Sequence, residues 1–152
     1  MIEVESGRFT IGVFQDVTWA QKGLDALKRG GFPLESLTII AKESRDTSAL
    51  VERTFGLAGE RLDLAGIGPI VALGPLVDAL QGNTRDLRRL GLAGAMRRIG
   101  FQAHDGRIFE TLTGRGGVLV AIRSEPRAAD ALAILHSYGG GNAAIGAWTG
   151  RV

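Results

Sequence analysis

Cysteine is absent from this chain of 152 residues, which also contains only two histidines and few aromatic side chains. The absence of cysteine excludes disulfides, thiolate metal sites and a cysteine nucleophile. No His-Glu-x-x-His pattern and no acidic calcium loop occurs, so we expect no metal and no cofactor. With so few aromatic residues, the chain also lacks a stacking platform for single-stranded nucleic acid.

Long apolar runs are lacking as well. No stretch reaches the length that spans a bilayer, and the first residues, MIEVESGRFT, carry acids where a secretory signal carries positive charge. The sequence therefore predicts a cytoplasmic protein. Its length is that of a single domain with one hydrophobic core, which we place at residues 1–152.

Glycine, by contrast, is abundant, with 23 residues against a usual share of roughly 7%. Runs of glycine end the helices of two similar patterns of strand, helix and strand. The first half, residues 7–42, has these elements at Phe9–Phe14, in a helix capped by Asp16 or Thr18, and at Leu37–Ala41.

The second half, residues 116–150, repeats this pattern. Its elements are a strand at Val118–Ile122, a helix capped by Ser124, and a short strand at Ala143–Trp148. A constant offset aligns Leu24 with Leu132 and Leu27 with Leu135. We therefore expect the two residues of each pair to occupy equivalent buried positions.

Two such halves in tandem predict an α+β fold, the split βαβ arrangement of the ferredoxin-like sandwich. In this arrangement two helices cover one face of a four-stranded antiparallel sheet, and the first and third strands are central. The competing hypothesis is a doubly wound parallel sheet. The chain supplies too few alternating strands and helices for that fold.

An insert, residues 43–115, separates the halves and is far longer than the usual connection of about two to six residues. We expect helices at 47–55, from 83 or 84 to 99, and at 102–112. Its least polar segment, LAGIGPIVALGPL, contains Pro69 and Pro75, which exclude one straight helix. We expect a bent, extended entry and then a short helix at Pro75–Leu80.

The apolar residues of this segment exceed what a surface loop leaves in water, because a contiguous exposed apolar patch usually marks an interface. A bilayer is a poor cover for a run so short and kinked. We therefore expect a second copy of the chain to cover it in a homo-oligomer. The expected interface residues are Ile67, Ile70, Val71, Leu73, Leu76, Val77 and Leu80.

Arginines crowd the region that follows this segment. They form either a solvated helix face or a candidate surface for an acidic protein partner. Phosphate contact is the alternative, but the net charge is only +2 and no helix-turn-helix pattern occurs. We therefore expect no nucleic-acid partner. The arginines of this surface are Arg85, Arg88, Arg89, Arg97 and Arg98.

Catalysis would need a nucleophile or a base with a partner. His104 and Asp105 are adjacent, and adjacent helix residues do not face each other; His136 has no companion motif. The glycine runs at 113–117 and 138–142 could form anion-binding nests, but their place after helices favours helix termination. We expect no enzyme and no catalytic residue.

Three segments carry a resemblance to a known family: TIGVFQDVTWAQKGLDALKRGGFPLESLTIIAKE, the element GIGPIVALGPL, and GRGGVLVAI before an alanine-rich helix. Over nearly its whole length, the sequence resembles a bacterial general stress protein domain family (heat-induced, YflT-like). The resemblance implies a stress-associated protein and indicates little about its chemistry.

The sequence thus predicts a non-enzymatic, stress-associated interaction protein that self-associates through its apolar insert or a sheet edge. A small-ligand-binding regulatory module is the alternative, by analogy with ferredoxin-like pairs that bind metabolites between subunits. A peripheral membrane-associated protein is the third, less favoured hypothesis.

Overall fold

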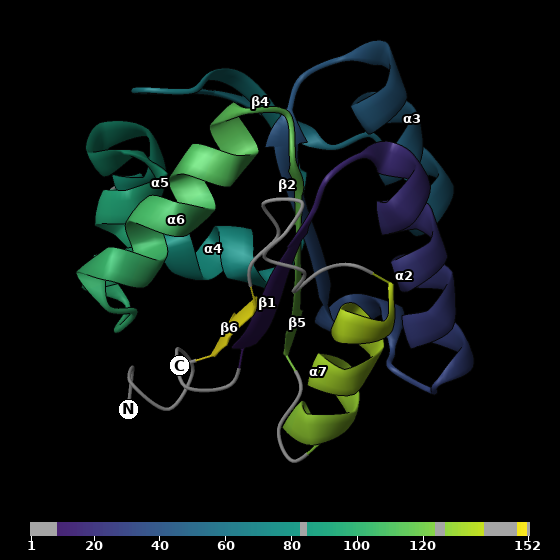
Figure 1. The fold of residues 1–152 in the computed structure, drawn as a ribbon. Helices are drawn as coiled ribbons and strands as arrows, with labels where there is room; N and C mark the ends of the chain where they lie inside the picture. Colours follow the sequence, from purple (N-terminus) through teal and green to yellow (C-terminus); the bar gives the residue numbers. More distant parts are fainter. Residues whose placement is uncertain (1–8, 83–84, 124–126, 139–148, 152) are drawn as a thin grey trace.

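A six-stranded sheet forms the centre of the computed structural model, which describes residues 9–82, 85–123, 127–138 and 149–151 (Figure 1). The strand order is β3-β4-β2-β5-β1-β6, and neighbouring strands are antiparallel. The strands are β1 (Phe9–Phe14), β2 (Leu37–Lys42), β3 (Glu60–Leu64), β4 (Gly68–Leu73), β5 (Val118–Arg123) and β6 (Thr149–Arg151). The predicted last strand, Ala143–Trp148, lies outside the described residues.

The two halves of the chain interleave in this sheet. Helix α2 (Val17–Arg29) connects β1 to β2, and β5 of the other half lies between those two strands. Helix α7 (Ala128–Ser137) stands between β5 and β6 in the chain, and β1 separates these two strands in the sheet. The predicted α+β class is confirmed, and β1 and β5 are central as expected.

The local features predicted for the first helix are present. Asp16 caps α2, because its Oδ1 accepts a hydrogen bond from Trp19 N at 2.9 Å. Gly30 ends the helix and donates its N–H to Ala26 O at 2.9 Å. In the second half, the predicted cap Ser124 and the glycines at 139–141 lie outside the described residues.

Helices cover both faces of the sheet (Figure 1). On one face lie α2, α7 and α3 (Arg45–Phe55); on the other lie α4 (Pro75–Gln81), α5 (Asp86–Arg98) and α6 (Ala103–Gly114). A short 3-10 turn, Leu34–Ser36, precedes β2. Alternate residues of β5 enter two separate cores, with Leu119 in one and Val120 in the other. The central strands are therefore buried on both faces.

Helices α4, α5 and α6 of the insert form the second helical layer, which corrects the expectation of an exposed apolar patch. That expectation assumed that only one face of the sheet needs cover. Ile11, Ile40 and Leu119 on the other face must be buried too, and the insert buries them. Of the expected interface residues, Leu73 is half-buried. The others are at most 9% exposed in the single chain: Ile67, Ile70, Val71, Leu76, Val77 and Leu80.

The extended entry predicted before Pro75 is part of a β-hairpin. Strands β3 and β4 pair with Leu62 opposite Ile70. Gly66, with φ of 85°, stands in the turn between them, and Gly68, with φ of 96°, is the first residue of β4. Pro69 is tolerated because it stands near the start of β4, before the pairing with β2 begins at Ile70. The short helix predicted at Pro75–Leu80 is confirmed as α4.

Helix α5 agrees with the helix predicted to end near residue 99, but it is kinked. Gly91 has φ 77° and ψ 175°, so the helix stops there and restarts. Glu110 of α6 caps the restart, since its Oε2 accepts a hydrogen bond from Ala93 N at 3.2 Å. The expected start of the helix at residues 83–84 lies outside the described residues.

Candidate ligand-binding pocket

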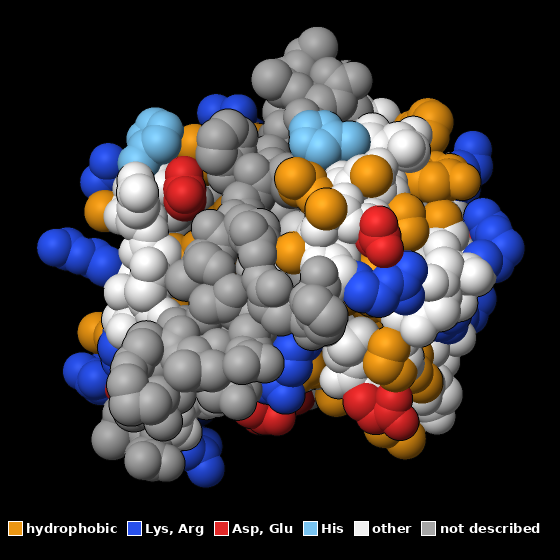
Figure 2. All heavy atoms as spheres, turned by 90° about the horizontal axis from the view of Figure 1, so that it is seen from below, with side chains coloured by type: hydrophobic (Ala, Val, Ile, Leu, Met, Phe, Trp, Pro, Cys, Tyr) orange, Lys and Arg blue, Asp and Glu red, His pale blue; other side chains and the backbone are white. Residues whose placement is uncertain are grey.

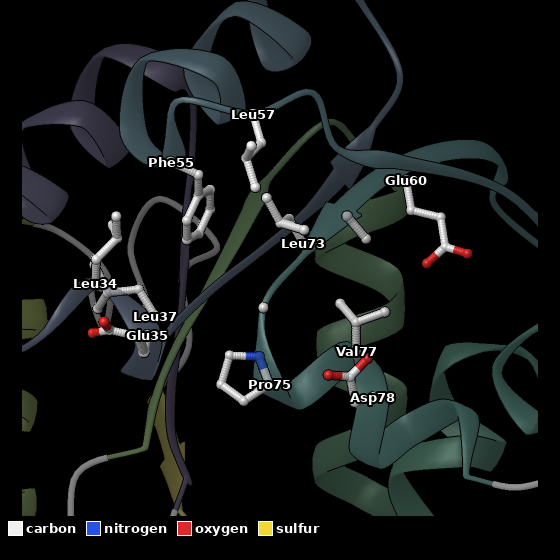
Figure 3. A pocket seen from close by; sticks show the side chains of 12 residues that line it. Leu34, Glu35, Leu37, Phe55, Leu57, Glu60, Leu73, Pro75, Val77 and Asp78 are labelled. Atoms are coloured by element: carbon white, nitrogen blue, oxygen red, sulfur yellow. The ribbon is translucent and has the colours of Figure 1, made fainter.

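A pocket of about 400 Å³ opens at the end of the sheet where β2 begins and β4 ends. These strands are antiparallel, with Ile39 opposite Leu73, so the start of one lies beside the end of the other. The 3-10 turn enters β2 here, and α4 leaves β4 here. The segment that follows α3 also borders the pocket on its way to β3 (Figure 3).

The inner surface of the pocket is apolar. Leu37 and Val77 are buried, while Phe55, Leu73 and Pro75 are half-buried. Figure 3 shows these side chains around one shared space. Apolar walls with a few polar groups are typical of sites for small molecules.

Two exposed leucines border the pocket. Leu34 is 38% exposed and Leu57 is 62% exposed, whereas most large hydrophobic side chains of the described residues are buried. Leu34 follows Pro33 at the start of the 3-10 turn. Leu57 follows Gly56, which ends α3 in the left-handed conformation. Both leucines offer apolar surface that a bound molecule would remove from water.

Three carboxylates complete the rim: Glu35, Glu60 and Asp78. All three are exposed, and none has a hydrogen bond or ion pair with another part of the chain that the structure describes. Arg61, next to Glu60 in the sequence, pairs with Glu43 instead. The pocket is therefore apolar inside and negatively charged at its mouth.

Gly74 lets the end of β4 approach β2 closely. A Cβ on this residue would lie 2.3 Å from Leu37 O and 2.5 Å from Thr38 Cα, and its φ is 128°. Gly74 has no side chain to cap α4, and Thr38 of β2 takes this role. Its Oγ1 accepts a hydrogen bond from Leu76 N at 3.0 Å. The close approach of Gly74 to β2 shapes the pocket, because Leu37 of β2 and Pro75, which follows Gly74, both line it.

The arginine surface predicted on α5 divides into two parts. Arg89 and Arg98 bind the buried carboxylate of Asp86, with N···O distances of 2.5 and 2.6 Å. These two arginines therefore have a structural role within the chain. Arg85, Arg88 and Arg97 are exposed, so the surface for an acidic partner stays a prediction that rests on these three.

We expect Arg98→Met to lower the free energy of unfolding by about 1.5–3 kcal/mol, because hydrogen bonds to charged groups are lost. Arg98 binds Asp86 and also donates to Ala79 O at 2.6 Å and to Leu80 O at 3.1 Å, at the end of α4. Its exposed neighbour is the control, and Arg97→Met should change stability by less than about 0.5 kcal/mol. Urea unfolding measures both, and equal effects would contradict the structural role of Arg98.

The residues considered for catalysis do not converge. His104 and His136 are exposed, and Figure 2 shows histidine side chains at two separate places on the surface. Within the described ranges, no group of three or more histidine or acidic side chains is placed to hold a metal ion.

The glycine run at 113–117 ends α6, as predicted. Gly116 N–H donates to Thr113 O at 3.1 Å, and Gly117 N–H donates to Leu112 O at 2.9 Å, so these N–H groups are not directed at an anion. The second run, 138–142, lies outside the described residues after Tyr138.

Comparison with family models, curated proteins and solved structures finds no match to this chain. The resemblance to the general stress protein domain family therefore stays a prediction. None of the helices in the described segments is long and apolar enough to cross a membrane.

Sequence reasoning missed the pocket, although Leu73 and Val77 of the expected interface do line it. The missed residues include Leu34 and Leu57. Each is a lone apolar residue beside a turn residue, where polar residues are more usual. That position was the available signal, but nothing in the sequence shows that the two leucines border one cavity.

Proposed function

We propose that this protein is a non-enzymatic binding protein whose pocket takes a small, largely apolar molecule. The supporting observation is an apolar cavity of about 400 Å³ bordered by the exposed Leu34 and Leu57. Pockets of about 300–1,000 Å³ are the usual size for small-molecule sites. This proposal adopts the small-ligand module that the sequence left as the alternative.

Self-association is the weaker candidate. The insert residues expected at an interface between copies are mostly core residues of one chain. The edge strand β3 exposes Glu60, Arg61 and Asp63, and charged side chains on an edge strand oppose pairing with another strand. The association with stress rests on the resemblance and is a proposal on that basis alone.

The expected affinity follows from the apolar surface that a ligand can bury. Removing roughly 200 Å² of apolar surface from water contributes about 5 kcal/mol, which corresponds to a dissociation constant of about 0.2 mM. Lost translational and rotational freedom reduces this gain. We therefore expect simple apolar compounds to bind in the high micromolar to millimolar range.

The test uses N-phenyl-1-naphthylamine, an uncharged probe whose fluorescence rises in apolar surroundings. We expect saturable binding to the wild-type chain. Leu57→Ser should weaken it about tenfold, because loss of a leucine contact costs about 1.5 kcal/mol. Titration of the probe into each protein gives the dissociation constants.

The matched control is Leu90→Ser. Leu90 is 40% exposed on α5 and does not line the pocket, so its replacement should leave probe binding unchanged. Both leucines are exposed, and we expect both variants to keep the wild-type fold. The proposal fails if the wild type binds no probe, or if the two substitutions weaken binding equally.

A further inference from the structure

The charges around the pocket all have one sign. Glu35, Glu60 and Asp78 border it, and no lysine, arginine or histidine is among the described residues that line it. Figure 3 shows Glu60 and Asp78 on one side of the cavity and Glu35 on the other. A molecule bound among the leucines would therefore have carboxylates on two sides.

The negative charge around the pocket is a local feature, because the whole chain has a formal net charge of +2. The general field of the protein thus does not select cations, and any preference must come from the pocket itself. None of the rim carboxylates has an ion-pair or hydrogen-bond partner within the described structure, so all three are available to a ligand. The apolar wall beside them lowers the local polarisability, which strengthens their effect on a bound charge.

We propose that the pocket selects an apolar compound that carries a cationic end group, either an ammonium or a guanidinium. This inference rests on the proposed function of the pocket. The apolar part of the ligand lies against Leu37, Leu57 and Leu73, and the cation lies at the mouth between the carboxylates. An anionic compound of the same length is repelled by the same three groups.

The experiment compares three compounds with the same eight-carbon chain at pH 7 and low salt: octylamine, octan-1-ol and octanoate. Each competes with N-phenyl-1-naphthylamine for the pocket. We expect octylammonium to bind at least about tenfold more tightly than octanol, and octanoate to bind more weakly than octanol. Because the end groups lie at an exposed rim, about 0.5 M salt should reduce these differences.

Two double variants identify the charges responsible. Glu60→Gln with Asp78→Asn keeps the shape of the side chains and should abolish most of the preference for octylammonium while leaving octanol binding unchanged. The control is Asp46→Asn with Asp63→Asn, which changes the net charge equally at exposed positions that do not line the pocket. The control should retain the preference.

The outcomes separate this inference from the proposed function. If octanol displaces the probe but octylammonium binds no more tightly, the pocket is a binding site and the cation preference is wrong. The same holds if both double variants lose the preference equally, because net charge and not the rim would then be the cause. If neither the probe nor any octyl compound binds, both proposals are wrong.

Discussion

Gly74→Ala should reduce the free energy of unfolding by more than about 4 kcal/mol, a size reserved for severe steric or burial defects. The added Cβ would lie 2.3 Å from Leu37 O and 2.5 Å from Thr38 Cα, and these are backbone atoms of a central strand that cannot turn away. The φ of 128° adds conformational strain. Relief would require β2 and β4 to separate, which would expose core residues.

Gly66→Ala is the matched control for this substitution. Gly66 also has a positive φ, 85°, but nothing lies within 4 Å of the position that its Cβ would take. Its replacement should therefore cost only the conformational strain, about 1–2 kcal/mol. Urea unfolding followed by circular dichroism compares the two. Similar losses would mean that Gly74 does not make the close contact with β2.

Leu24→Ala should destabilise the protein by about 2–5 kcal/mol, because it removes a fully buried side chain and leaves a cavity. The internal repeat predicts the same loss for Leu132→Ala. The structure corrects this expectation, since Leu132 is only half-buried on α7, and we expect its replacement to cost about 1 kcal/mol.

The repeat still holds one helical turn further on. Leu27 and Leu135 are both fully buried in the same core, so Leu27→Ala and Leu135→Ala should have similar, large effects on thermal unfolding. Equal losses of stability for Leu24→Ala and Leu132→Ala would contradict the structure, in which Leu24 is fully buried and Leu132 is half-buried. Unequal losses at Leu27 and Leu135 would instead contradict the remaining equivalence.

The features predictable from the sequence were those that depend on neighbouring residues. The cap at Asp16, the helix start at Pro75 and the apolar strands predicted at Phe9–Phe14 and Val118–Ile122 follow from local patterns. The hairpin of β3 and β4 was missed, although ERLDL alternates polar and apolar residues. Pro69 and Pro75 are unfavourable inside a paired strand, so the sequence pattern of this segment favours an irregular conformation.

The larger error concerned what the insert covers. Hydrophobicity along the chain shows that residues such as Ile70 and Leu76 need burial, but it does not show whether a second molecule or the chain itself buries them. The pocket could not be predicted for a similar reason, because residues that are far apart in the sequence form it. Leu34 and Asp78 border one cavity because β2 and β4 pair, and pairing between distant strands is not visible in a single sequence.

The pairing of β1 with β5 also has a consequence for biosynthesis. Phe9 lies opposite Arg123, so β1 meets its central partner only after about a hundred further residues have been made. At roughly 5–20 residues per second on the ribosome, this takes about 5–20 s. During that time the strand FTIGVF, buried throughout in the finished fold, has no β5 beside it. Contacts between such distant residues slow folding, and the nascent chain must stay soluble until its last third emerges.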